Sequence, residues 1–247
     1  MEETAEIKFI FSPKGDNHVD GTVYITTTIE GEKNTSQVLF RKYGQLQDAD
    51  IERAKALTSH LTSNLENIEI HPVLTAQLII AAMNANIVFH RDKKFDNLDA
   101  NFHTGFFRLN TLITTFSRLL SEETDEFKEA RQFKHEPLQG LWYKHVEDAS
   151  ISGMAQNILN ETKKGNWIKQ SLIDEFGPLD GSEEFGKHRI DFLAKQYSEG
   201  ALNRRYERQA MSGEWLFFQK TEEGTLFLTL ASHQENDERI MARITGN

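Results

Sequence analysis

Apolar and polar positions alternate along much of the first 43 residues, which is typical of strands. The segments EIKFIF (6–11), GTVYITTTIE (21–30) and SQVLFRKY (36–43) are rich in Ile, Val, Thr and Phe. The stretches between them, KGDNHVDG and GEKN, carry the residues that favour turns. The pattern predicts a three-stranded antiparallel meander at the N-terminus.

From Asp48 the period changes to that of a helix. The stretch DADIERAKALTSHLTSNLENI places its apolar residues on one face, namely Ile51, Ala54, Leu57, Leu61 and Leu65. Pro72 opens a second helix, HPVLTAQLIIAAMNANIVF, which is apolar nearly all round and is therefore expected to be central. A third helix is predicted from about 98 to 123. Strands followed by helices predict the α+β class.

The second half opens with three further helical patterns. The acidic TDEFKEARQFK before them is expected to be a solvated short helix or a linker, so we predict two domains, 1–130 and 131–247. The helical patterns are SISGMAQNILNETKK, NWIKQSLIDEFG and a long one from Ser182 to about Met211, with Ser182 as its N-cap. They predict a helical segment in the middle of the chain.

The period returns to two near the C-terminus. GEWLFFQK (213–220) and GTLFLTLASH (224–233) are separated by TEE, the spacing of a tight hairpin in a small antiparallel sheet. One face is expected to hold Trp215, Phe217, Leu226, Leu228 and Leu230, and the opposite face Leu216 and Phe218. The last segment, NDERIMARI, fits either a third strand or a terminal helix.

Composition excludes several kinds of protein. The chain has no Cys, which excludes disulfides, a thiolate nucleophile and cysteine-ligated zinc. Its acidic N-terminus is the reverse of a signal peptide, and no run of about 18 apolar residues is present, so we expect a cytoplasmic protein that does not contact membranes. A net charge of −10 argues against broad attraction to nucleic acid, so RNA binding would need a local basic patch.

Motifs exclude further classes. No GxGxxG or GxxxxGK[ST] loop is present for dinucleotides or nucleoside triphosphates, no HExxH helix and no GxSxG elbow. We therefore predict no cofactor.

The stretch KHEPLQGLWYKHV (134–146) is the first candidate for chemistry. His135 and His145 are separated by Pro137 and Gly140, which argues against one helix presenting them as a metal-binding pair. We predict no metal site here. One of the two imidazoles could instead line a cleft and exchange a proton near neutral pH.

The same stretch has a purely structural interpretation. Its apolar residues would anchor a loop-to-helix transition onto the core, with Lys144 and His145 on the outer face. The anchoring residues would be Leu138, Leu141, Trp142 and Val146. The sequence leaves both interpretations open.

A basic stripe on the long predicted helix is the second candidate. Arg204, Arg205 and Arg208 lie beside Tyr206 just before the C-terminal hairpin. Guanidinium groups match phosphate oxygens because their planar fork donates two hydrogen bonds at once. The alternative is a solvated helix face that pairs with nearby acidic side chains.

His233 is the third candidate because it stands at the end of the second hairpin strand. A rigid strand aims such a residue while substrate can still reach it. A simple turn residue is the alternative.

Helices followed by the hairpin GEWLFFQKTEEGTLFLTLASH and then NDERIMARI resemble the nuclease superfamily of barnase, EndoU and RelE-type toxins, over roughly residues 135–247. Members of that superfamily mostly cleave RNA without a metal, so the resemblance implies a toxin-like ribonuclease. It implies catalytic roles for His145, Arg204, Arg205 and His233, and substrate binding by His135, Lys144, Tyr206 and Arg208. The acidic balance of the chain departs from the usual basic nuclease.

In such a nuclease one histidine would take a proton from the ribose 2′-OH, and a second acid would protonate the leaving 5′-oxygen. Arg204 or Arg205 would stabilise the charge on the phosphorane, and the product would be a 2′,3′-cyclic phosphate. The N-terminal domain would position, restrain or target the nuclease half.

A non-enzymatic protein is the competing hypothesis. An acidic interaction module, for instance from a phage or a defence system, would bind a basic protein partner through its charge of −10. Its histidines at 135, 145 and 233 would be dispersed, whereas a nuclease needs at least two of them in one cleft with an arginine. The oligomeric state stays open.

Overall fold

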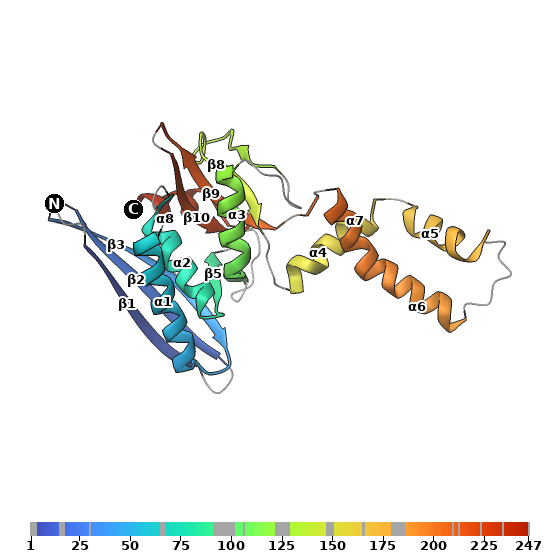
Figure 1. Cartoon of the computed structure of the whole chain (residues 1–247), viewed down its shortest axis with the longest axis horizontal. Coiled ribbons are helices and arrows are strands. Elements are labelled where there is room, and N and C mark those ends of the chain that lie inside the picture. Colours follow the sequence, from blue (N-terminus) through green and yellow to red (C-terminus); the bar gives the residue numbers. More distant parts are fainter. Residues whose placement is uncertain are drawn as a thin grey trace.

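A computed structural model shows a body built around two sheets and a helical arm, residues 151–207, that projects from it (Figure 1). The residues that the structure describes are 4–14, 18–29, 31–64, 68–90, 102–105, 107–121, 129–146, 151–164, 166–178, 186–208, 210–211, 213–222, 224–233 and 235–246. The α+β class is confirmed.

The first sheet contains the predicted meander. Its five strands are β1 (Thr4–Lys14), β2 (His18–Ile29), β3 (Glu32–Tyr43), β5 (Asn86–His90) and β6 (Phe102–Gly105), in that order across the sheet. All four pairings are antiparallel. Alternate residues of β2 and β3, such as Val23 and Phe40, are buried, so one face of the sheet packs on the core.

The three helices that follow lie within the ranges predicted from the sequence. They are α1 (Asp48–Asn64), α2 (Pro72–Ala82) and α3 (Leu109–Ser121). The prediction that the second is central is confirmed, because the four consecutive residues 77–80 are all buried and together point to every side of the helix. Extending it through residue 89 was wrong: Asn84 adopts φ 51 in a tight turn, and the apolar run after it forms β5. Starting the third helix at 98 was also wrong, since 102–105 form β6.

The second sheet incorporates the predicted C-terminal hairpin. Its order is β4 (Ile68–Ile70), β10 (Thr225–Ala231), β9 (Glu214–Lys220), β8 (Trp142–Val146) and β7 (Arg131–Gln132). The predicted loop-to-helix transition was wrong, because residues 142–146 form the strand β8, and Lys144 and His145 are buried in it and do not lie on an outer face. NDERIMARI forms the helix α8 (Asp237–Thr245), and the Asn236 side chain accepts hydrogen bonds from two backbone N–H groups in its first turn.

A register shift between Phe227 and Thr229 decides which residues of β10 face which way. Leu226, before the shift, packs against the cluster that holds Phe217 and Ile240 of α8. Leu228, within the shift, belongs to the same cluster. Beyond the shift, Leu230 joins the larger core. Placing Leu230 on the same face as Leu228 was therefore wrong, since strict alternation does not survive a bulge.

Residues on either side of the predicted domain boundary at 130 share one core. The strand β4 pairs in parallel with β10, and the ring of Phe116 in α3 lies 4.7 Å from that of Phe227. The fully buried Gln77 of α2 donates to the carbonyl oxygen of Leu230 at 2.9 Å and accepts from its N–H at 2.7 Å. One element from the first half thus completes the sheet of the second.

The arm contains the predicted central helices. They are α4 (Ile151–Thr162), α5 (Trp167–Phe176), α6 (Lys187–Lys195), the π-helical turn η2 (Gln196–Gly200) and α7 (Ala201–Glu207). Ser182, the predicted cap, lies outside the described residues. None of the described helices is both long enough and apolar enough to cross a membrane.

Candidate functional site

The pairing of β8 with β9 sets the position of His145. In the antiparallel ladder His145 lies opposite Trp215, and Tyr143 lies opposite Phe217. Side chains directly opposite one another share a face, and so do residues two apart on a strand. Tyr143, His145 and Trp215 therefore lie on the same face of the sheet, and His145 is almost fully buried there, with 5% exposed.

His233 reaches the same place from the next strand. The end of β10 lies beside β9, where Ala231 is opposite Trp215, and His233 follows two residues later. The His233 ring lies 4.2 Å from that of Trp215 and 5.0 Å from that of His145, nearly parallel to the latter at 24°. Two imidazoles 88 residues apart in the chain thus stack on one another. The nuclease hypothesis required such a pair together with an arginine in the same cleft.

The hydrogen bonds of this pair indicate where its protons lie. The Nδ1 atom of His145 is 3.1 Å from the carbonyl oxygen of Gly213 and 3.3 Å from Nε2 of His233. Because a carbonyl oxygen can only accept, we assign the proton of neutral His145 to Nδ1 and its lone pair to Nε2. Nε2 of His233 is then an acceptor towards the same proton, which puts the proton of neutral His233 on its Nδ1.

Glu214 holds the turn that carries His233. This carboxylate is 8% exposed and accepts hydrogen bonds from the N–H of His233 at 2.6 Å and from the hydroxyl of Ser232 at 3.3 Å. Neither Glu214 nor Trp215 was predicted as part of the site. The sequence carries a weak signal for both, since they begin the strand that separates the two histidines in the sheet.

A hollow lies on the β7–β8 edge of the same sheet. It is lined by Arg131, Gln132, Phe133, Lys134, His135 and Tyr143. The ring of Tyr143 is 6.0 Å from that of His145 and 5.5 Å from that of Trp215, so aromatic side chains connect the hollow to the histidine pair. Of the predicted substrate-binding residues, His135 lies at this hollow.

Lys144 belongs to the other face of the sheet. It lies opposite Leu216, whose side chain is in the main core, and it is itself only 5% exposed. Alternation along β8 therefore separates Lys144 from its two neighbours Tyr143 and His145. Its predicted contact with substrate does not fit this position.

No protein-family model, curated protein or solved structure matches this chain. The resemblance to the toxin nucleases therefore stays a prediction. Among the described residues, no group of three or more His, Asp or Glu side chains is placed to hold a metal ion.

The basic stripe lies on α7, in the arm, and its side chains have carboxylate and amide partners there. Arg204 and Arg208 both pair with the buried Glu161 of α4. Arg205 is 3% exposed, and its Nε donates to Asn157 at 2.9 Å. Burial lowers the pKa of the Arg205 guanidinium. The contacts of Arg204 and Arg208 match the structural interpretation, in which the arginines of the stripe pair with nearby acidic groups. Arg205 does not match it, because it is buried and not solvated, and its described side-chain partner is an amide.

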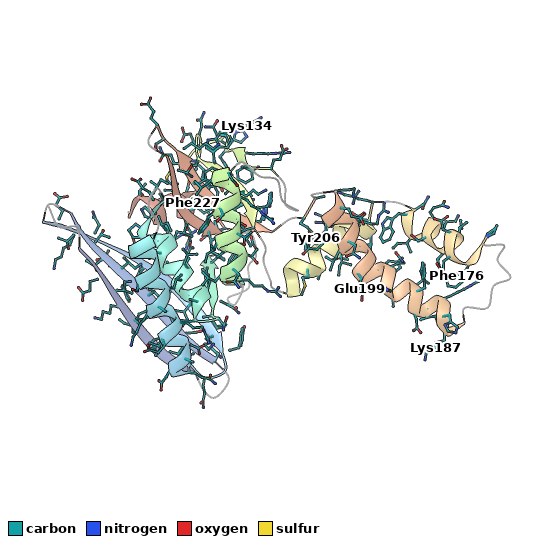
Figure 2. All side chains as sticks on the ribbon, viewed as in Figure 1. Lys134, Phe176, Lys187, Glu199, Tyr206 and Phe227 are labelled. Atoms are coloured by element: carbon teal, nitrogen blue, oxygen red, sulfur yellow. The ribbon has the colours of Figure 1, made fainter. Side chains whose placement is uncertain are left out.

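The contacts that the structure describes for these arginines lie within the arm and join α7 to α4, and none of them is with either histidine. Tyr206 is exposed on the arm, whereas Lys134 lies on the body, at its top in Figure 2. The predicted convergence of an arginine from α7 with His145 does not correspond to the described contacts of either residue. The site that the structure assembles is the histidine pair, Trp215, Tyr143 and the hollow.

Proposed function

We propose that the protein is a metal-independent ribonuclease in which His145 and His233 transfer the protons. The observation that carries this proposal is the contact between Nδ1 of His145 and Nε2 of His233 at 3.3 Å. An acid and a base in contact on a rigid sheet can take a proton from the attacking hydroxyl and give one to the leaving oxygen of a phosphodiester.

The assigned tautomers make the pair bifunctional while both rings are neutral. The lone pair on Nε2 of His145 accepts the proton of the ribose 2′-OH, and the 2′-oxygen attacks phosphorus. The Nδ1 proton of His145 passes to Nε2 of His233, and the Nδ1 proton of His233 passes to the leaving 5′-oxygen. The bond from phosphorus to the 5′-oxygen breaks, leaving a 2′,3′-cyclic phosphate and a 5′-hydroxyl.

The transferred protons balance, since the pair gains one proton and gives up one, and both rings change tautomer. Exchange with water restores the starting tautomers. Two positive imidazoliums in contact would repel each other, which favours a relay between neutral rings over a doubly charged pair. A relay of this kind also needs the rings held in place, and the contacts of Glu214 and Trp215 with His233 do so.

The test is cleavage of mixed RNA by the whole chain in the presence of EDTA, followed by analysis of the new 3′ ends. We expect cyclic phosphate ends from the parent, and rates about 10²- to 10⁴-fold lower for His145→Ala and His233→Ala, the usual contribution of general acid–base catalysis. His188→Ala is the matched control, because His188 is an exposed histidine of the arm. Absence of cleavage by the parent, or equal rates in all variants, would reject the proposal and favour the interaction module.

A further inference from the structure

The register of the β7–β8 pair places a basic side chain beside the site. Arg131 lies directly opposite Tyr143, so the two share the face on which His145 lies. Tyr143 and His145 are two residues apart on one strand, which is about 7 Å along its axis. The hollow therefore lies within reach of a phosphate adjacent to one bound at the histidine pair.

The charge of this edge differs from that of the whole chain. Between residues 131 and 146 Glu136 is the one acidic residue, although the net charge of the chain is −10. Arg131 and Lys134 are exposed, and within the described residues neither side chain has an ion pair. Arg204 and Arg208 in the arm, in contrast, are both paired with Glu161. The cations at the hollow are thus available to an anion from outside the chain.

Aromatic side chains line the hollow at this edge. The ring of Phe133 packs edge-on against Tyr143 at 5.4 Å and against Trp215 at 5.7 Å. Phe133 and Tyr143 are both partly exposed and line the hollow. Rings that are held by their neighbours and still reach the surface can stack on unpaired bases, whereas the bases of a duplex are stacked on each other.

We propose that this hollow is a binding subsite for single-stranded RNA. Arg131, Lys134 and His135 contact the phosphate next to the scissile one, and Tyr143 stacks on the adjoining base. The inference rests on the proposed ribonuclease function, since it places the scissile phosphate at the histidine pair. It assigns substrate recognition to the β7–β8 edge in place of the arginines of the arm.

The test measures binding of a short fluorescent RNA to the whole chain by anisotropy over a range of salt concentrations. The RNA carries 2′-O-methyl groups, which have no 2′ proton to lose, so binding is measured without cleavage. Arg131→Ala/Lys134→Ala is compared with Lys163→Ala/Lys164→Ala, which removes the same charge from an exposed turn of the arm. Removing the two cations that neutralise this one phosphate should reduce the slope of log K against log salt by about 0.7, the value for one phosphate of a single strand.

The expected result is weaker binding and a smaller slope for the first double variant, with parental values for the second. Equal binding by both, or a parent that binds no single-stranded RNA, overturns the subsite. Cleavage of ordinary RNA is measured in parallel and separates the two proposals. If binding depends on Arg131 and Lys134 but the parent does not cleave, the subsite stands and the ribonuclease proposal falls. If the parent cleaves RNA but its binding does not depend on Arg131 and Lys134, the ribonuclease proposal stands and the subsite falls.

Discussion

Replacing Gln77 by Leu tests how strongly the first half of the chain supports the sheet that carries the site. Gln77 is fully buried in α2, and its Oε1 accepts from the N–H of Leu230 at 2.7 Å and from the hydroxyl of Thr229 at 3.1 Å. Leucine has a similar volume but neither donor nor acceptor. The substitution therefore removes hydrogen bonds with little change in packing.

The structure indicates which loss dominates. The carbonyl oxygen of Leu230 keeps a donor in Arg243, whose Nη2 is 3.1 Å away, and the Thr229 hydroxyl keeps that carbonyl as acceptor at 3.0 Å. The N–H of Leu230 has no such replacement among the described contacts. Leaving one buried donor unsatisfied costs about 1–3 kcal/mol. We expect the free energy of unfolding to fall by about that amount.

Urea denaturation followed by tryptophan fluorescence measures the change, since Trp142 and Trp215 lie in the second sheet. Gln170→Leu is the matched control, because Gln170 is exposed on the arm and should change stability by less than about 0.5 kcal/mol. An equally small effect of Gln77→Leu would refute the argument that α2 supports β10 through this side chain.

Three further predictions follow from single contacts. Burial lowers the pKa of His71, so below about pH 6.5 the unfolded chain binds more protons than the folded chain, and stability should fall as the pH drops. His71→Asn keeps an acceptor for the helix cap and should flatten this pH dependence, as measured by thermal melts at several pH values. Phe227→Ala should cost about 3–5 kcal/mol in urea denaturation, because its ring is fully buried. Glu214→Ala should slow RNA cleavage by releasing His233, and Glu214→Gln, which keeps an acceptor, should restore part of the rate.

Local patterns were enough to predict the elements that repeat one period without interruption. The meander and α1 follow from their own residues. The two strands of the C-terminal hairpin do so as well, but the facing of the β10 residues does not, because a register shift interrupts their alternation. Errors occur where a bulge interrupts one period, as in β10, and where one period changes into another over a few residues. At Asn84 a left-handed turn divides an apolar run into a helix and a strand, and either would have fitted the apolar pattern alone.

The site could be predicted in part. His145 and His233 have residue types suited to proton transfer, but their contact depends on β9 lying between β8 and β10, which is a non-local property of the sheet. The arginines of α7 match phosphate in chemistry, yet their partners on α4 are more than 40 residues away in the chain. Sequence spacing within α7 carries no information about that partner, so the arginine stripe was indistinguishable from a binding surface.

The central claim is that His145 and His233 act as one proton relay in RNA cleavage, and a double-mutant cycle tests it most directly. Cleavage rates in EDTA are measured for the parent, His145→Ala, His233→Ala and the double variant. A relay fails when either ring is lost, so the double variant should be about as slow as each single variant, as for residues that act as a unit. Rate losses that multiply in the double variant would show two independent groups and contradict the account.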